Sequence, residues 1–243
     1  MGIGYRDSFM ALLGSDDSAQ YYAFCDQDDF WLPEKVRLGV EALEEAAKDT
    51  PHRPMLYTSA CQYCDGELRE TATPAATGIA PPFEQTLFYN SALGFTILMN
   101  RALRDLVIRF APPCPGIPHD KLAVQLALLF GRYIADPRRT ALYRRHGATV
   151  TTTTGSALRL LRTWVAKDIF GSTMEYYRRH AREFRAALEA EGSAPESALR
   201  LLSLFGGGAG ARFGWFRRLL FPKRLRPTLS GELALRLCFL IGR

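Results

Sequence analysis

The sequence predicts an α/β body followed by a helical C-terminal part. Up to about residue 153, short apolar runs of strand length alternate with stretches of helical spacing, the pattern of a sheet flanked by helices. Beyond that point only helical patterns follow. The 243 residues, 47% of them hydrophobic and 23% charged, are typical of a globular chain with one sizeable core and a smaller appendage. We therefore expect domains at 1–153 and 154–243.

Within the body, strands and helices are expected in turn. Strands are predicted where compact apolar runs end at polar or turn residues, at 21–25, 55–60, 95–99, 133–135 and 140–143. Helices are predicted where apolar residues recur at helical spacing, at 5–13, 34–48, 101–110 and 121–130. Pro33 suits the first turn of the second helix. The prolines between 112 and 118 predict a stiff loop, and the Ala, Thr, Pro and Gly residues of 71–82 a longer one.

The C-terminal part is predicted to hold helices at 158–191, 196–204, 212–220 and 231–241. None of these stretches approaches the ~20 consecutive apolar residues of a transmembrane helix, so we expect no membrane span. Five cysteines and no N-terminal signal peptide favour a reducing, cytoplasmic location. Cys61 and Cys64 form a single CxxC without a second ligand pair. We therefore interpret the cysteines as small apolar residues rather than as a zinc site.

The formal net charge of +6 indicates an anionic partner, which leaves nucleic acid, an anionic membrane and a phosphate-bearing substrate open. Between residues 209 and 229 there are six Arg or Lys residues and no acid, and aromatic residues are interleaved with them. This pattern favours an interfacial helix on an anionic membrane. Packing of the aromatic residues on the body is an alternative, as is single-stranded nucleic-acid binding. Nothing else in the chain resembles a nucleic-acid module, so we expect no nucleic-acid partner.

The segment that carries the most chemistry follows the first predicted strand. Asp26, Asp28 and Asp29 place three carboxylates within four residues, and these repel one another unless a counter-charge is present. The carboxyl end of a strand is where α/β sheets bind ligands. Oxygen ligands of this kind suit Mg²⁺ or Mn²⁺, which share carboxylates with substrate phosphates. The alternative is an acidic turn that caps the following helix.

Residues 24–31, continued by Leu32-Pro33-Glu34-Lys35, resemble the DQDDxW…K signature of bacterial family 2 glycosyltransferases, especially their rhamnosyltransferase-like branch. Further motifs of that branch are matched in the same order. They are a strand and turn at 61–66, an N…G…NR segment at 90–101, an HD pair at 119–120 and a YRxHG ending at 143–147. An ordered series is more specific than any one motif. The resemblance implies a GT-A fold, in which a mixed sheet is flanked by helices.

The resemblance also implies roles for individual residues. Asp26 and Asp28 stand at the DxD positions, where a Mg²⁺ or Mn²⁺ ion and the donor diphosphate meet. Asp120 stands at the position of the catalytic base, which deprotonates the acceptor hydroxyl as that oxygen attacks the anomeric carbon with inversion. The residues implied to neutralise the diphosphate or complete the metal shell are Arg144, Arg145 and His146. Those implied to line the substrate site are Trp31, Asn90, Gly94 and His119.

For several of these residues a purely structural explanation stays open. Asp120 begins a predicted helix, where it would also serve as the N-cap. Asn90 and Gly94 are residue types common in turns. A residue such as His146 is often a surface histidine, and Trp31 is of a size that favours partial burial in a core.

The chain departs from the family pattern at its start. Members of the branch carry a strand and a βαβ unit that hold the nucleobase and ribose ahead of the DxD motif, whereas 25 residues precede Asp26 here. We therefore expect an incomplete GT-A fold that lacks its N-terminal nucleotide-binding strands. Without them a parallel sheet exposes a strand edge and apolar faces that helices normally cover.

Together these features predict an inverting, metal-dependent glycosyltransferase. We expect it to move a sugar, with rhamnose the leading candidate by resemblance, from a nucleoside-diphosphate donor to a glycan or lipid-linked acceptor in cell-surface polysaccharide synthesis. Its expected location is cytoplasmic, peripheral on the inner face of the membrane through residues 209–229. The alternative is an inactive, truncated remnant that acts as a membrane-associated interaction module. Asp26, Asp28 and Asp120 favour the enzyme, and the short N-terminal part favours the remnant.

Overall fold

The computed structural model of the chain describes residues 4–145, 172–207 and 211–240. The chain divides into two compact units. Unit 1 comprises residues 1–81, 91–112 and 117–149, and unit 2 comprises residues 82–90, 113–116 and 150–243. The predicted boundary after residue 153 and residues 158–171 of the helix predicted at 158–191 lie outside the described residues.

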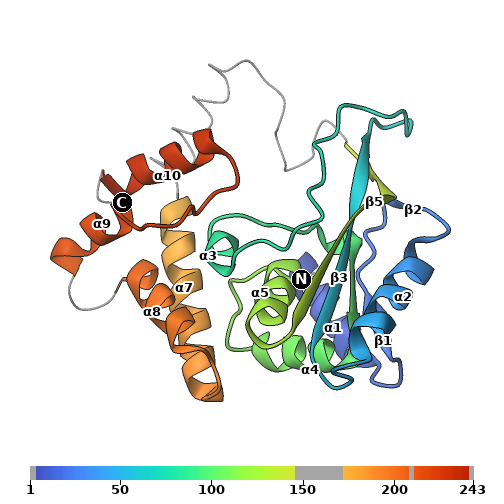
Figure 1. Ribbon diagram of the computed structural model, residues 1–243, viewed down its shortest axis with the longest axis horizontal. Coiled ribbons are helices and arrows are strands. Elements are labelled where there is room, and N and C mark those ends of the chain that lie inside the picture. Colours follow the sequence, from blue (N-terminus) through green and yellow to red (C-terminus); the bar gives the residue numbers. More distant parts are fainter. Residues whose placement is uncertain (1–3, 146–171, 208–210, 241–243) are drawn as a thin grey trace. The chain divides into compact units, whose positions relative to one another are not determined.

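Unit 1 is built on a five-stranded mixed sheet with the strand order β1–β4–β3–β5–β2 (Figure 1). The strands are β1 (Tyr21–Ala23), β2 (Phe30–Trp31), β3 (Met55–Cys64), β4 (Ile97–Asn100) and β5 (Arg132–Arg144). β3 and β5 run parallel, and the other neighbouring pairs run antiparallel. The prediction of an α/β body with a mixed sheet is confirmed.

One strand differs from its prediction. Two short extended pieces were expected at 133–135 and 140–143, but β5 is continuous from Arg132 to Arg144. Ser59 of β3 pairs with Asp136, whereas the next residue of β3 pairs with Arg139. Pro137 and its neighbour therefore lie in a bulge, where the missing N–H of proline breaks no ladder hydrogen bond.

Helices cover both faces of this sheet. They are α1 (Tyr5–Ser15), α2 (Lys35–Ala47), α4 (Arg101–Phe110) and α5 (His119–Phe130). On one face, α2 forms a buried cluster with β3 and β4 that contains Leu43, Ala46, Met55, Tyr57 and Leu98. A Cβ on Gly39 of α2 would lie 2.7 Å from the Leu98 side chain, so glycine permits this close approach. Figure 1 shows α4 and α5 on the opposite side of the sheet from α2.

The start of α4 is fixed by its N-cap, Asn100, the last residue of β4. The Asn100 Oδ1 accepts a hydrogen bond from the main-chain nitrogen of Leu103, at 3.1 Å, which satisfies one free donor of the first turn. The same oxygen accepts from the nitrogen of Met55, at 2.9 Å. One side chain thus caps the helix and ties it to the beginning of β3.

Unit 2 is helical. Its elements are α3 (Phe83–Thr86), α7 (Thr173–Glu191), α8 (Glu196–Gly206), α9 (Ala211–Leu219) and α10 (Leu229–Leu240). Its interior is aromatic, since the ring of Phe205 lies 4.9 Å from that of Phe88 and 5.6 Å from that of Phe239. Residues 82–90 therefore belong with the C-terminal helices, although they lie between β3 and β4 in the sequence. The predicted helical C-terminal part is confirmed for the described ranges.

No helix in the described ranges combines the length and the hydropathy that a membrane crossing requires.

Candidate functional site

The loop that joins β1 to β2 carries the three predicted carboxylates, and we call residues 24–29 the acidic loop. Asp26 and Asp29 are half-buried, and Asp28 is exposed. The Asp29 Oδ1 accepts a hydrogen bond from the main-chain nitrogen of Arg144, at 3.1 Å. Because β2 also pairs with β5, the acidic loop is held beside the last residues of β5.

Negative charge accumulates in this loop. Burial raises the pKa of Asp26 above its usual range, and the charges of Asp28 and Asp120 raise it further. The pKa of Asp29 is raised to about 7, mainly by burial; the hydrogen bond from Arg144 opposes this shift. Asp120 is thus close enough to act electrostatically on the acidic loop, although it lies on α5. The fold gathers carboxylates from two distant parts of the sequence.

Asp120 lies in the first turn of α5 and is buried, with 8% of its surface exposed. The helix begins at His119 and its N-cap residue is Pro118, so Asp120 is not the N-cap. Its Oδ1 accepts a hydrogen bond from the main-chain nitrogen of Lys121, at 2.7 Å. A carboxylate in the first turn of a helix is stabilised by the helix dipole. This position places the Asp120 carboxyl group at a buried point within electrostatic reach of Asp26.

His119, the neighbour of Asp120, is packed among aromatic rings. Its ring stacks on Phe9 at 4.3 Å and meets the edge of Phe24 at 4.5 Å. Neither ring nitrogen has a hydrogen-bond partner, and burial lowers the pKa of the imidazole. A Cβ on Gly94 would lie 2.8 Å from the His119 Nε2. Glycine at position 94 therefore makes room for a neutral histidine in the core of unit 1.

The end of β5 supplies two of the predicted cationic residues. The charge of Arg144 acts on Asp29, and its buried Nε has no hydrogen-bond partner. The guanidinium of Arg145 lies over the ring of Tyr63, 5.4 Å from its centre. Arg144 is thus brought to the acidic loop, whereas Arg145 packs on the edge of β3. The predicted ligand His146 lies outside the described residues.

Trp31 and Lys35 form a second group next to the acidic loop. The Lys35 Nζ lies 5.1 Å from the centre of the Trp31 ring, a cation–π arrangement. Lys35 is buried, with 3% of its surface exposed, and burial lowers the pKa of its amine to about 8. Both the Lys35 Nζ and the Trp31 Nε1 are buried without a hydrogen-bond partner. Such donors are rare in proteins, because a buried polar group without a partner is destabilising.

Lys35 and Asp29 belong to the motif that the sequence singled out, but neither was predicted as an individual site residue. Both charges act on the partly buried thiol of Cys61, whose pKa burial raises to about 12, so the three residues share one neighbourhood. The sequence feature that could have drawn attention to Lys35 was its position in the first turn of a helix, four residues after Trp31. Exposed lysines are common at such positions, so the sequence alone did not reveal its burial.

The acidic loop offers carboxylates that suit a divalent cation, but it does not form a complete set of metal ligands. The repulsion that raises the pKa of Asp26 is the kind that Mg²⁺ or Mn²⁺ relieves, and carboxylate oxygens suit both ions. Within the described ranges, however, no three His, Cys, Asp or Glu side chains converge as a ready-made metal site. A cation held by one or two carboxylates and completed by substrate phosphates requires no such convergence.

The remaining predicted residue, Asn90, is exposed. It belongs to unit 2, whereas the acidic loop belongs to unit 1.

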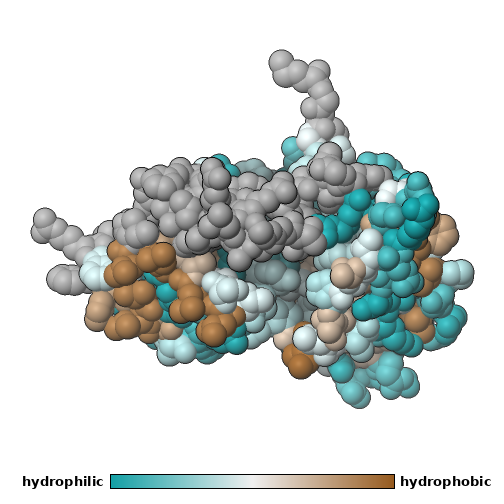
Figure 2. Space-filling model, turned by 90° about the horizontal axis from the view of Figure 1, so that it is seen from above, coloured by the Kyte–Doolittle hydropathy of each residue, from teal (hydrophilic) through white to brown (hydrophobic). Residues whose placement is uncertain are grey.

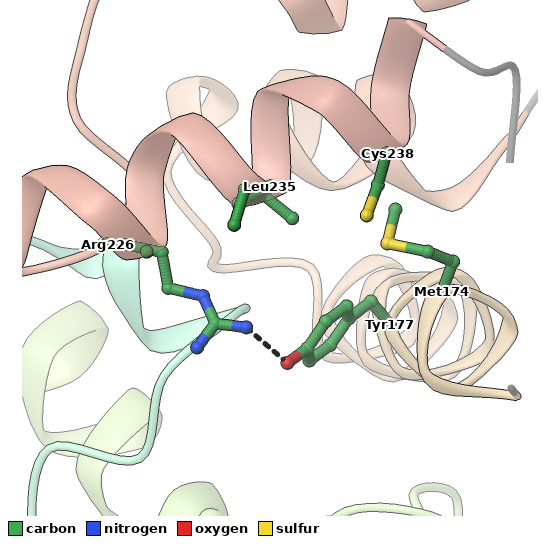
Figure 3. Close-up of a pocket in the computed structure, with 7 residues that line it drawn as sticks. Met174, Tyr177, Arg226, Leu235 and Cys238 are labelled. Atoms are coloured by element: carbon green, nitrogen blue, oxygen red, sulfur yellow. Dashed lines mark hydrogen bonds between the residues drawn. The ribbon is translucent and has the colours of Figure 1, made fainter. Parts of the chain in front are cut away.

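Unit 2 also holds a pocket with about 310 Å³ of empty space, open to solvent, between α7 and α10 (Figure 3). Its polar end is Arg226, whose Nη2 donates to the Tyr177 hydroxyl at 2.9 Å. None of the site residues predicted from the sequence lines this pocket, which is otherwise lined by Met174, Gly231, Ala234, Leu235 and Cys238.

Comparison of the chain with protein-family models, with curated proteins and with solved structures found no match. The family resemblance therefore rests on the motifs of the sequence itself.

Proposed function

We propose that this chain carries the catalytic site of an inverting, metal-dependent glycosyltransferase of the GT-A type, related to family 2. Its donor would be a nucleoside-diphosphate sugar, with rhamnose the first sugar to test, and its acceptor a glycan or a lipid-linked sugar. Unit 1 would hold the donor and the acceptor hydroxyl. Asp26, Asp28 and Asp120 would carry the chemistry.

The observation that carries this proposal is the pairing of crowded carboxylates with buried donors that lack partners. Burial raises the pKa of Asp26, and the charges of Asp28 and Asp120 raise it further. Beside them, buried donor atoms of three side chains have no hydrogen-bond partner among the residues that the structure describes: Trp31 Nε1, Lys35 Nζ and Arg144 Nε. A cation bound to a diphosphate complements the carboxylates, and oxygen atoms of a sugar or diphosphate complement the donors. One anionic, oxygen-rich ligand with its bound cation would therefore complement both the carboxylates and the donors.

In the proposed reaction each residue does a specific task. Asp120 takes the proton of the acceptor hydroxyl, which is a weak nucleophile until a positioned carboxylate removes that proton. Arg144 stabilises the negative charge that develops on the departing diphosphate. Asp26 and Asp28 would hold the divalent cation, which when bound supplies further positive charge at the leaving group. Trp31 offers an apolar ring face to the donor sugar.

Calorimetric titration with UDP and with dTDP, each with and without Mn²⁺, tests the proposal. We expect Mn²⁺-dependent binding of at least one nucleotide, because phosphates complete the coordination that one or two carboxylates begin. Asp28→Asn, which removes one exposed charge while keeping the side-chain shape, should weaken that binding by about tenfold or more. Asp49→Asn, at an exposed position after α2, is the matched control and should bind as the native chain does.

Binding that does not require Mn²⁺, or that Asp28→Asn leaves unchanged, would contradict the assignment of the acidic loop. A folded chain that binds neither nucleotide would instead favour the second candidate, a non-catalytic module that associates with membranes. The exposed apolar residues of α10 give that candidate an observation of its own.

A further inference from the structure

One face of α10 is made of exposed leucines. Leu229, Leu233, Leu237 and Leu240 follow one another at steps of four, four and three residues, which places them on a single stripe of the helix. Their exposed fractions range from 41% to 67%. The opposite side of α10 is buried in unit 2. We call the four residues the leucine face, and Figure 2 shows a hydrophobic patch over the C-terminal helices.

The leucine face belongs to a well-anchored helix. Glu232 is buried, and its Oε2 accepts hydrogen bonds from the main-chain nitrogens of Leu225 and Arg226, at 2.7 and 2.8 Å. Its Oε1 accepts from the Nε of Arg236, at 2.7 Å. Arg236 also donates to the carbonyl oxygens of Arg218 and Leu219, at the end of α9. These bonds hold α9, α10 and the loop between them together, and we call the exposed side chains of the three segments the α9–α10 surface.

The same surface contributes aromatic residues and cations. Trp215 and Phe216 of α9 and Leu220 after it are exposed, by 38%, 48% and 60%. Among the basic residues, Arg218 and Arg226 turn inward, where they donate to the carbonyl of Leu204 and the hydroxyl of Tyr177. Of the basic side chains whose burial the structure describes in this segment, Arg217, Lys223 and Arg224 are exposed.

No exposed carboxylate offsets these cations on α9, α10 or their connection. Glu232 is the only acidic residue between positions 209 and 243, and it is buried against Arg236. Lys223 makes an ion pair with Glu84, at 2.9 Å, so Arg217 and Arg224 are the exposed cations outside that pair among the described side chains. The surface therefore combines exposed leucine and aromatic side chains with positive charge. An acidic protein partner would match the charge but has less need of a continuous leucine stripe.

We propose that this surface docks onto an anionic lipid bilayer, with the leucine face and Trp215 inserted at the interface and Arg217 and Arg224 at the headgroups. Apolar side chains on one side and cations beside them are what an interfacial helix presents to anionic lipid. The sequence pointed to residues 209–229, and the structure moves the apolar contact to α10, beyond that range. The inference goes beyond the transferase activity and does not depend on it.

Vesicle flotation of the full chain tests the docking surface. We expect association with phosphatidylcholine vesicles that contain about 30% phosphatidylglycerol and little with pure phosphatidylcholine, because anionic headgroups attract the exposed cations. Raising the salt from about 0.1 M to about 0.5 M should weaken association, since salt screens exposed charges. The emission of the chain should shift to shorter wavelength on binding, and Trp215→Phe should remove most of that shift.

Matched variants separate the apolar contribution from the electrostatic one. Leu233→Ser and Leu237→Ser should each lower the vesicle partition coefficient about tenfold, the loss expected for an inserted leucine. Leu12→Ser, at an exposed position of α1, is their control and should have no effect. Arg217→Gln and Arg224→Gln should each lower the coefficient about fivefold. Arg53→Gln, exposed in unit 1, is the control for charge.

Other occupants of the leucine face predict different outcomes. If Leu233→Ser and Leu237→Ser together convert a dimer into a monomer in sedimentation and leave vesicle association unchanged, the face joins two copies of the chain and the proposal fails. It also fails if the double variant lowers the melting temperature by several degrees, because the face is then covered within the chain. Equal association with neutral and anionic vesicles, or none with either, would likewise overturn it.

Discussion

The two units treat buried charge in opposite ways. In unit 2 the carboxylate of Glu232 is buried, but two main-chain nitrogens and Arg236 donate to it. In unit 1 the amine of Lys35 is buried to a similar degree, and it has no hydrogen-bond partner. The first arrangement stabilises a fold, because every lone pair that leaves water finds a donor. The second leaves an amine with a cation–π contact to Trp31 but without a hydrogen bond, near the acidic loop.

The two units also differ in the apolar side chains that they expose. Unit 2 exposes the leucine face, which the hydrophobic effect would favour burying. In unit 1 the buried donors Trp31 Nε1, Lys35 Nζ and Arg144 Nε lie near the acidic loop and have no hydrogen-bond partner among the described residues. Residues that contradict the ordinary burial rule tend to mark functional positions, since the fold tolerates their local instability. The comparison therefore supports the proposals of a ligand site in unit 1 and of an interface in unit 2, and the following variants test them.

The largest effect is expected for Asp120→Asn. If Asp120 is the base, the rate of sugar transfer should fall by about 10²–10⁴, because the acceptor hydroxyl then loses its proton acceptor. The rate is measured as release of nucleoside diphosphate from whichever donor binds. Mn²⁺-dependent nucleotide binding should persist, and Asp49→Asn is the control. A rate within about twofold of the native value would remove Asp120 from the chemistry.

Glu232→Gln should strongly destabilise the helical unit. The substitution removes a buried charge and leaves Arg236 without its ion-pair partner, so the free energy of unfolding should fall by about 3 kcal/mol or more. Urea unfolding followed by circular dichroism measures this loss. Glu189→Gln, which breaks an exposed pair with Arg185 on α7, should change stability by no more than about 0.5 kcal/mol. Equal effects of the two substitutions would contradict the distinction between buried and exposed pairs.

Lys35→Met should stabilise the chain, in contrast to Glu232→Gln. The pKa of Lys35 is about 8 in the folded chain against 10.5 for an unperturbed lysine, a difference of 10.5 − 8 = 2.5 units. At about 1.36 kcal/mol per unit, the buried amine lowers stability by roughly 3 kcal/mol below pH 8. Between pH 8 and 10.5 the unfolded chain binds more protons than the folded chain, so stability rises with pH and the penalty disappears.

The stabilisation by Lys35→Met should therefore be largest near pH 7 and small near pH 10.5. Urea unfolding at both pH values measures the difference, with Lys48→Met, at an exposed position, as the control. A destabilising effect at pH 7 would show that Lys35 has a counter-charge in solution.

Gly94→Ala should destabilise unit 1 by about 2 kcal/mol, because the added methyl group meets the ring of His119. The loss should be smaller in a chain that also carries His119→Ala, since the clashing ring is then absent. Thermal unfolding of the four members of this double-mutant cycle measures the coupling. Gly4→Ala, where a Cβ meets no atom within 4 Å, should have little effect. Additive effects at positions 94 and 119 would contradict the packing described for this pair.

The smallest effect is expected where the leucine face is changed. Leu237→Ser should alter the free energy of unfolding by about 0.5 kcal/mol or less, because an exposed leucine contributes little to folding. Urea unfolding in the absence of lipid measures this change. A much larger loss would mean that the leucine face supports the fold and would weaken the contrast between the two units.

Periodicity and punctuation were sufficient to predict most elements. The helices α2, α4 and α5 and the strands β3 and β4 begin within a few residues of their predicted positions, because apolar spacing and residues such as Pro33 act locally. The two-residue strand β2 was missed, since so short a strand has no periodicity. Residues 83–86 were not predicted as helix either, because a single turn leaves little sequence pattern.

The motifs likewise located the acidic loop and Asp120 from the sequence alone. That Asp120 acts electrostatically on Asp26 depends on the packing of α5 against the sheet, which no local pattern encodes. The burial of Lys35, the aromatic surroundings of His119 and the anchoring of Asp29 by Arg144 are also tertiary. Each depends on contacts between residues far apart in the chain.

The sequence by itself therefore determined the α/β class, the helical C-terminal part, the carboxylate motif and the basic segment, because these are properties of neighbouring residues. Only the tertiary structure decided the parallel pairing of β3 with β5, the inclusion of residues 82–90 in unit 2, and which cations of the basic segment stay exposed. Burial is a property of the packed chain, and the free energy of a charge depends on its burial and its partners.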